Sequence, residues 1–479
     1  MERFLSSKNL LNSLIETTEK LANPVKLGFL SKLFVWSVLM EPLLLFVVAG
    51  QATAGVGGNI SRLLQLIVVV SLAYKFVFTR ASNVRVPNPF HYHYKWYFYY
   101  LLFLIISFLV GYYNGYFKLN SVSFADSNYS GFSYLLNSTY TRPIFEYVIS
   151  AYYFIYFVIL PRYLINSTQG IDYFFKIFIY TFYACLILGL LDYFLIVFLD
   201  IENFIPRHLS DFRDPGRRFH GLAGEPRDAI VYMGFGLGIL FLRDLFMTEK
   251  RTPKPIILLV MICMLLTESF SGFVGLLIGV TLIAVYQVPR IPVKYIAALS
   301  FLLVLGSVAI FFTVVNSERV LKYVEALPLA VLAFQKATTV PPVIEAQIAN
   351  IYPVWIRLTE LLDMNLVPLF FGSGLGTASI ANNIFYDVDA VYNPHANFIR
   401  IFFESGIIGS LLYANAFLHP IRRIIKDRVI KNTFIYYLLI ILGLNLGHRS
   451  STIFIFLGIS LLIFSHINNQ KNESQTPKS

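Results

Sequence analysis

The sequence predicts an all-α membrane protein, a polytopic bundle of about twelve transmembrane helices. Of its 479 residues, 57% are hydrophobic and only 14% are charged. The mean hydropathy is +0.65, and no soluble domain of this size hides so much apolar surface. Apolar runs long enough to cross a bilayer recur along the chain. Its aromatic residues, 16% of the total, are expected between helices and in interfacial belts. The two cysteines, Cys185 and Cys263, lie inside apolar runs and give no disulfide framework.

The chain divides into five parts. They are a polar N-terminal segment (1–27), nine spans (28–315) with an arginine-rich loop at 200–227, a long polar segment (316–397), three further spans (398–466) and a polar tail (467–479). The expected spans are 28–50, 59–79, 96–112, 143–160, 172–199, 228–246, 256–267, 270–287, 295–315, 398–418, 433–446 and 451–466.

Lysine and arginine set the expected orientation. They gather in four loops, at 75–95, 250–254, 290–294 and 422–431. The positive-inside rule makes these loops cytoplasmic, which places both termini in the cytoplasm. These loops also explain most of the net charge of +11, so the charge gives no argument for nucleic-acid binding. Alternation of the spans then places 113–142, 200–227 and 316–397 on the outer side.

The loop 206–227 contains five arginines and no lysine, although outer loops normally avoid positive charge. Arginine without lysine favours forked recognition of an oxyanion such as phosphate. We therefore expect Arg217, Arg218 and Arg227 to bind a phosphate or pyrophosphate. Pro226 is suited to the first position of the next helix, whose positive end would add to their field. The alternative is a solvated loop whose arginines pair internally with Asp211, Asp214, Glu225 and Asp228.

His395 is the candidate general base. Asn393 can cap the following helix and Pro394 can begin it, so His395 would lie in the first turn. The positive end of the helix dipole disfavours imidazolium, which would keep His395 neutral and able to accept a proton. The alternative is an interfacial histidine bonded to a nearby loop. One turn further on, Arg400 and Glu404 are spaced to pair with each other.

Arg357 precedes a glycine-rich stretch at 371–376, which lacks the preceding strand of a dinucleotide site and is expected to form a turn near the substrate. Arg357 is either a further phosphate or sugar contact or a surface ion pair.

No His, Asp or Cys cluster has metal-ligand spacing, so neither a metal nor another cofactor is expected. Further polar side chains expected to line the substrate site are Glu225, His220, Tyr392, Asn397 and Arg449.

Three stretches, at 218–226, 369–376 and 395–409, occur in an order that resembles the family of O-antigen ligases and O-antigen or exopolysaccharide polymerases. The resemblance covers the chain from about residue 200 onward. The sequences of the motifs are more similar to those of the polymerase branch. Two positions depart from the family pattern. Ala396 replaces an asparagine after His395, and Phe270 stands where arginine is common.

The resemblance implies a metal-independent, membrane-embedded glycosyltransferase of the GT-C-like type in the bacterial inner membrane, with its active site facing the periplasm. Such an enzyme moves a glycan from an undecaprenyl-pyrophosphate donor to a sugar hydroxyl of a lipid-linked acceptor, with inversion. His395 would be the base and Arg218 and Arg217 would hold the pyrophosphate, followed by Arg357 and Arg227. The implied partners are the lipid bilayer, the lipid-linked glycan and a chain-length regulator, with no nucleic acid. A ligase that uses a lipid A-core acceptor and a lipid-linked oligosaccharide flippase remain as alternatives.

Overall fold

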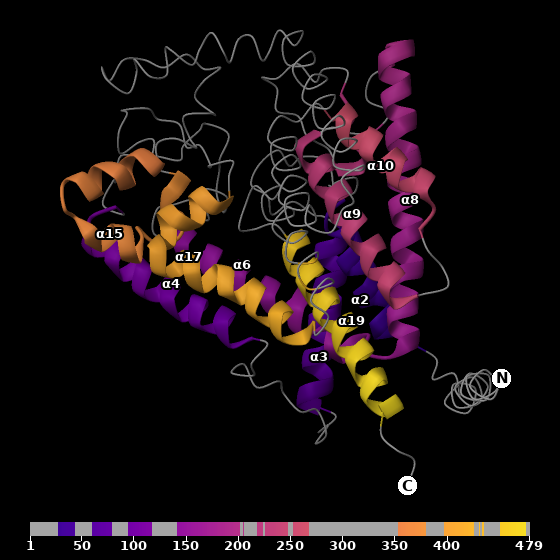
Figure 1. The fold of residues 1–479 in the computed structure, drawn as a ribbon, viewed down its shortest axis with the longest axis horizontal. Helices are drawn as coiled ribbons and strands as arrows, with labels where there is room; N and C mark the ends of the chain where they lie inside the picture. The colour runs from indigo at the N-terminus through magenta and orange to yellow at the C-terminus, as the bar shows by residue number, and fades with distance from the viewer. Residues whose placement is uncertain are drawn as a thin grey trace, which may run out of the picture.

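The computed structural model of the protein describes residues 27–43, 60–78, 94–116, 141–201, 205, 218–223, 226–247, 252–267, 353–379, 397–425, 431, 434 and 451–475. Throughout these ranges the regular structure is helical, without a strand (Figure 1). Six helices are long and apolar enough to cross a membrane, judged by length and composition: Lys95–Tyr113, Pro143–Leu164, Thr168–Leu199, Asp228–Phe246, Phe398–Ile424 and Ser451–Asn468. The helical membrane architecture is thus confirmed for this part of the chain. The count of twelve stays a prediction, because the expected spans 270–287 and 295–315 and nearly all of 433–446 lie outside the described residues.

The elements follow one another in this order: α2 (Phe29–Met40), α3 (Ile60–Phe78), α4 (Lys95–Tyr113), α6 (Thr141–Tyr153), the π-helix η1 (Phe154–Ile159), α7 (Pro161–Leu164), α8 (Thr168–Leu199), the 3-10 turn η2 (Gly221–Ala223), α9 (Pro226–Phe246), α10 (Lys254–Leu266), α15 (Leu366–Phe371), the 3-10 turn η4 (Thr377–Ser379), α17 (Asn397–Ile424) and α19 (Ser451–Gln475). A further helix covers 353–362.

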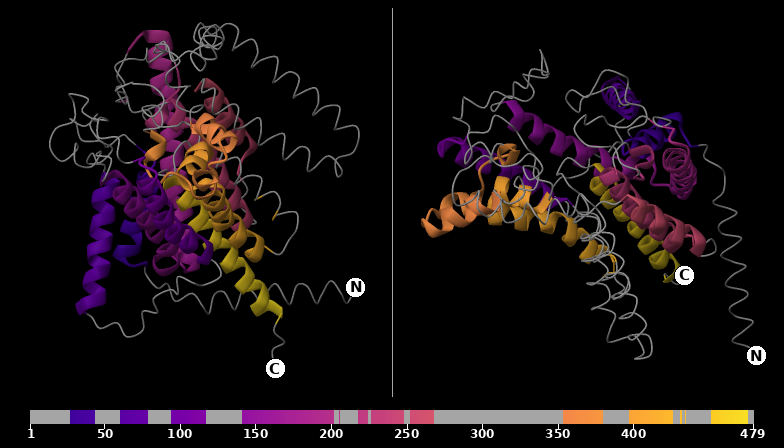
Figure 2. Two further views of the ribbon diagram at one scale, coloured as in Figure 1. Left: turned by 90° about the vertical axis from the view of Figure 1, so that its left-hand side faces the viewer. Right: turned by 90° about the horizontal axis from the view of Figure 1, so that it is seen from above.

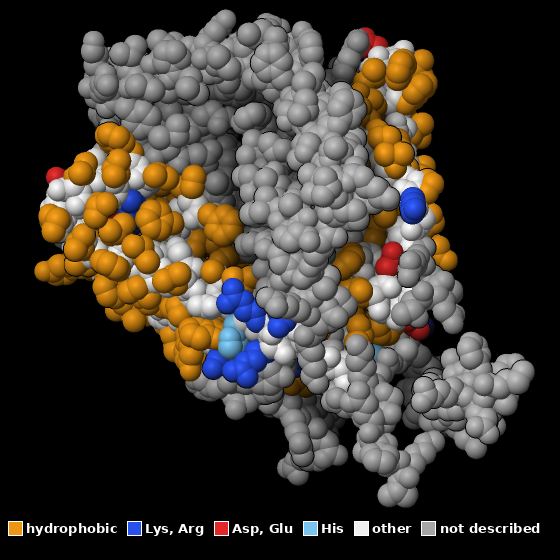
Figure 3. Space-filling model, viewed as in Figure 1, with side chains coloured by type: hydrophobic (Ala, Val, Ile, Leu, Met, Phe, Trp, Pro, Cys, Tyr) orange, Lys and Arg blue, Asp and Glu red, His pale blue; other side chains and the backbone are white. Residues whose placement is uncertain are grey.

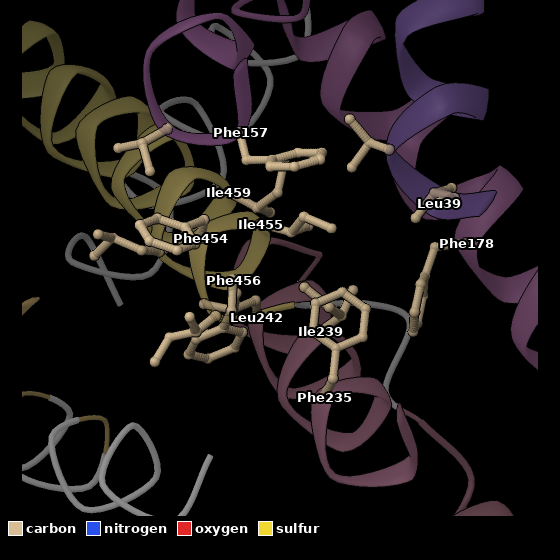
Figure 4. Packing of buried hydrophobic residues seen from close by; sticks show 14 of the residues in the cluster. Leu39, Phe157, Phe178, Phe235, Ile239, Leu242, Phe454, Ile455, Phe456 and Ile459 are labelled. Carbon is tan, nitrogen blue, oxygen red and sulfur yellow. The ribbon is translucent and has the colours of Figure 1, made fainter. Parts of the chain in front are cut away.

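The helix α19 lies at the centre of the bundle and contacts η1, α7, α9 and α17. Its apolar side chains meet those of η1, α8 and α9 in one buried cluster, in which Phe157, Ile239 and Phe454 are at most 1% exposed (Figure 4). A Cβ atom on Gly458 would lie 1.9 Å from the Phe157 carbonyl oxygen, so a glycine is needed where α19 crosses the π-helix. Close packing at a small residue is a usual basis of helix association in a membrane.

A second group of helices, α4, α15 and α17, packs on one flank of the bundle, while α9 and α10 lie on the other (Figures 1 and 2). The helices α4 and α17 run antiparallel. The rings of Trp96 and His419 meet at one end with centroids 5.9 Å apart, and those of Tyr116 and Phe403 meet at the other end at 6.3 Å.

Contacts between helix ends identify one end of the bundle, where the span 143–164 and the helices α9, α17 and α19 all end. These contacts are the hydrogen bond of Arg162 to Ser465 (2.7 Å), that of Asn468 to the Ile424 carbonyl (2.8 Å) and the ring contact of Phe246 with His466 (5.6 Å). Toward this end a group of cationic side chains gathers on a largely hydrophobic surface (Figure 3). Lys95 at the start of α4 and Arg422 and Arg423 near the end of α17 lie around His419 at this end. The starts of α9 and α17 and the end of α4 therefore share the opposite end, which we call the far end.

Candidate functional site

The described part of the arginine-rich loop consists of its two edges. Ile205 lies at the first edge, and 218–223 with the start of α9 forms the second. Arg217 and Glu225 lie outside the described residues, as does the side chain of Arg227. The helix α9 begins at Pro226, as the sequence predicts.

The segment 218–223 enters the bundle instead of lying on its surface. Phe219 is fully buried, and its backbone N–H donates to the Leu266 carbonyl at 2.9 Å. Arg218 Nε donates to the Thr267 carbonyl at 3.0 Å. On the other side, a Cβ atom on Gly189 would lie only 2.8 Å from the Gly221 Cα atom. Contacts with α8, α9 and the end of α10 thus fix the backbone that carries Arg218.

Asp192 on α8 ties the two edges of the loop together. Its Oδ1 accepts the Ile205 N–H at 2.9 Å. Its Oδ2 lies 2.9 Å from His220 Nε2, a close polar contact whose angle departs from that of a hydrogen bond. The second ring nitrogen of His220, Nδ1, lies 3.0 Å from the Gly221 carbonyl oxygen. The side chains of Asp192 and His220 are each only 2% exposed. His220, expected to line the substrate site, therefore points into the bundle toward Asp192.

The sequence analysis overlooked Asp192. The signal was available, because Asp192 is a carboxylate inside the predicted span 172–199, and ionisable residues in spans usually have a partner and a role.

Arg357 lies on the helix 353–362 and is 2% exposed. Its guanidinium forms an ion pair with Glu360, donates to Ser373 Oγ and to the Phe403 carbonyl, and lies 4.4 Å from the centroid of the Phe403 ring. These partners belong to the helix 353–362, the glycine-rich turn and α17. In this structure Arg357 thus holds three segments together, and its terminal nitrogens are engaged by the protein.

Tyr116, just beyond the end of α4, completes this cluster by donating to the other oxygen of Glu360. Burial and the neighbouring Glu360 raise the pKa of Tyr116 to about 12, so its hydroxyl remains protonated and can donate at neutral pH.

The glycine-rich turn lies against a break in α17. Gly372, Gly374 and Gly376 have φ values of 85°, 95° and 81°, which glycine adopts without a steric penalty. The helix α17 is interrupted at Gly406, with φ 64° and ψ −168°. Backbone carbonyls just before the break accept hydrogen bonds from the turn: Ser373 N to Phe403 O (3.1 Å) and Gly374 N to Glu404 O (2.9 Å). Irregular backbone at membrane depth is tolerated where protein groups satisfy it in this way.

A buried ionic network adjoins the break. Arg400 donates through Nη2 to both carboxylate oxygens of Glu146, at 2.9 and 2.7 Å, and through Nε to Glu404 at 3.1 Å. The pairing of Arg400 with Glu404 confirms the prediction from their spacing. The sequence did not single out Glu146, although it is a carboxylate near the start of a predicted span.

The remaining expected site residues cannot be placed. His395, Tyr392 and Arg449 lie outside the described residues, and for Asn397 only the backbone is described, as the first residue of α17. No group of three or more His, Cys, Asp or Glu side chains that could hold a metal ion is found in the described ranges.

The far end therefore carries two fixed polar clusters. One is the loop edge with Arg218, His220 and Asp192 among α8, α9 and α10, and the other is the Arg357 cluster among α4, α15 and α17. They lie on different flanks of the bundle (Figure 1). No protein-family model, curated protein or solved structure matches this chain.

Proposed function

We propose that this protein is a membrane-embedded glycosyltransferase of polysaccharide assembly, a polymerase that acts on undecaprenyl-pyrophosphate-linked glycans at the outer side of the bacterial inner membrane. The observation that carries the proposal is the edge of the arginine-rich loop, which is fixed in the bundle at the end opposite the cationic group of Lys95, Arg422 and Arg423. The positive-inside rule assigns that cationic end to the cytoplasm, which leaves the arginine-rich loop on the outer side.

The proposed chemistry is an inverting glycosyl transfer. The bond between the anomeric carbon and the pyrophosphate oxygen breaks, and negative charge develops on the leaving pyrophosphate. Arg217, Arg218 and Arg227 stabilise this charge through charge-assisted hydrogen bonds to the phosphate oxygens, and Arg218, whose Nε is already bonded to the Thr267 carbonyl, needs little reorganisation. His395 accepts the proton of the acceptor hydroxyl as its oxygen attacks the anomeric carbon. Arg357, with its guanidinium engaged by the protein, supports the glycine-rich turn in this scheme.

The decisive experiment is a reconstitution in liposomes with a single undecaprenyl-pyrophosphate-linked repeat unit as donor and acceptor. A polymerase gives a ladder of longer lipid-linked products. His395→Ala and Arg217→Gln should abolish or strongly reduce the ladder, while Arg423→Gln, at the cationic end, should leave it intact. A ladder that survives His395→Ala would refute the assigned base. If transfer occurs only after a lipid A-core acceptor is added, the protein is a ligase.

One observation favours the flippase alternative. The network of Arg400, Glu146 and Glu404 is buried between α6 and α17, and transporters commonly place ionisable groups in the interior of a bundle. Translocation of the lipid-linked unit without any new glycosidic bond would establish this alternative. A chain-length regulator would appear in the same reconstitution as a partner that narrows the distribution of product lengths.

A further inference from the structure

The cationic group of Lys95, Arg422 and Arg423 lies where two membrane-spanning helices end. Lys95 is the first residue of the span Lys95–Tyr113, and both arginines lie in the last turn of the span Phe398–Ile424. Spans of 19 and 27 residues are long enough to cross the hydrocarbon layer, so their ends lie near the level of the lipid phosphates. The cationic group is thus at the depth at which a lipid headgroup can reach it.

Two helices that are far apart in the sequence bring these cations together. The ring of Trp96 on α4 meets the ring of His419 on α17, with centroids 5.9 Å apart. Lys95 Nζ lies 5.7 Å from the centroid of the same Trp96 ring. Lys95, Arg422 and Arg423 are the charged side chains that act on His419, and all three are positive (Figure 3). Within the described residues no ion pair neutralises them.

The two arginines point to different sides of α17. Arg423 follows His419 by four residues, so it lies on the face that turns toward α4. Arg422 follows Leu411 by eleven residues, or about three turns, so these two share a face, and Leu411 is 59% exposed. Arg422 therefore stands at the end of a face of α17 that is open to the surroundings.

Lys95 stands at the end of a similar face of α4. Three exposed apolar side chains continue that face at intervals of four, seven and eleven residues from Lys95: Tyr99, Leu102 and Ile106. Each of them is between 40% and 47% exposed. A hydrophobic surface that leads directly to unpaired cations at the membrane boundary matches the two parts of a phospholipid, its acyl chains and its phosphate.

We propose that Lys95 and Arg422 bind the phosphate group of an anionic phospholipid in the leaflet at this end of the bundle, and that Arg423 adds to the positive potential. The acyl chains lie along the exposed apolar faces of α4 and α17. The charge selects an anionic headgroup, because the described surface offers cations and no carboxylate for the positive group of a zwitterionic lipid. This inference does not depend on the glycosyltransferase proposal, since the site lies at the opposite end of the bundle from the arginine-rich loop.

The test is native mass spectrometry of the full-length protein in maltoside micelles, titrated with phosphatidylglycerol or with phosphatidylcholine. We expect the wild type to retain one more molecule of phosphatidylglycerol than of phosphatidylcholine. Lys95→Gln and Arg422→Gln should each lower the apparent affinity of that site about tenfold, as for the loss of a charge-assisted hydrogen bond. Lys176→Gln removes an exposed positive charge from α8, outside the cationic group, and should bind phosphatidylglycerol as the wild type does.

Arg422→Lys separates the effect of charge from an effect on folding. It keeps the positive charge and should retain most of the affinity that Arg422→Gln loses. Equal affinity of the wild type and the double variant Lys95→Gln/Arg422→Gln for phosphatidylglycerol would overturn the proposal. Equal retention of the two lipids by the wild type would also overturn it. Displacement of phosphatidylglycerol by inorganic phosphate would overturn it as well, because the cations would then serve a soluble anion.

Discussion

Replacing Asp192 by alanine should release the second edge of the arginine-rich loop from the bundle. The substitution removes the acceptor of the Ile205 N–H and the carboxylate that contacts His220, both in a buried environment. An unsatisfied buried N–H costs about 1–3 kcal/mol, and the loss of the polar contact with the His220 ring adds about 1 kcal/mol. A total of about 3 kcal/mol increases the population in which the loop edge is detached by roughly a hundredfold.

Limited trypsin digestion measures this population at the bond that follows Arg218. In the wild type that bond is protected, because Phe219 is buried and its N–H is bonded to Leu266. If the edge opens and closes faster than trypsin cleaves, the rate of cleavage follows the detached population. We therefore expect cleavage after Arg218 to be roughly 10 to 100 times faster in Asp192→Ala, with a parallel loss of ladder synthesis in the liposome assay.

Two variants serve as controls. Asp192→Asn keeps an oxygen that can accept the Ile205 N–H and places an amide beside His220, so its cleavage rate should stay near that of the wild type. Lys176→Gln removes an exposed charge from the same helix and should not change the rate of cleavage after Arg218. If Asp192→Ala is cleaved no faster than the wild type, Asp192 does not hold the loop edge. If cleavage rises while the ladder persists, the loop edge is held by Asp192 but is not needed for catalysis.

Three further predictions concern stability, and thermal unfolding in detergent checks each of them. Gly406→Ala should destabilise the protein by about 2 kcal/mol or more, since φ is 64° and a Cβ atom would lie 2.4 Å from a backbone carbonyl of α15. Gly28→Ala should cost less, because no atom lies within 4 Å of the added Cβ and only the N-cap preference of α2 is affected. Arg400→Met should cost about 3–5 kcal/mol by leaving buried Glu146 without its partner, and adding Glu146→Leu should restore part of the loss. The hydroxyl of Tyr116 has a pKa raised to about 12, so its contribution is complete below pH 10 and declines toward pH 12, a decline that Tyr116→Phe should lack.

The sequence predicted the helices well because the bilayer imposes a simple length and hydropathy requirement. The expected spans 59–79, 96–112 and 228–246 correspond to Ile60–Phe78, Lys95–Tyr113 and Pro226–Phe246. Local rules also located the start of α9 at Pro226 and the pairing of Arg400 with Glu404. Both follow from spacing within a single helix.

Such local rules do not predict contacts between segments that are far apart in the sequence. Glu146 and Arg400 are 254 residues apart, and nothing in their local sequence indicates that they meet. The glycines at 372–376 predicted a turn, but not that its N–H groups would satisfy carbonyls at the break in α17. Gly406 interrupts the helix α17, and its local sequence did not indicate this break. Arg357, weighed as a substrate contact or a surface ion pair, is buried, and only the three-dimensional arrangement shows its partners.

The π-helix η1 sets the rotational phase between the two halves of its span. A π-helical turn contains one residue more than the corresponding α-helical turn, and each residue of an α-helix adds a rotation of about 100° around the helix axis. Deleting one residue from Phe154–Ile159 would restore regular α-helix and rotate α6 by about that angle relative to the face that packs on α19. Glu146 would then turn away from Arg400. The alignment of this buried ion pair thus depends on a single residue inserted in the middle of the same span.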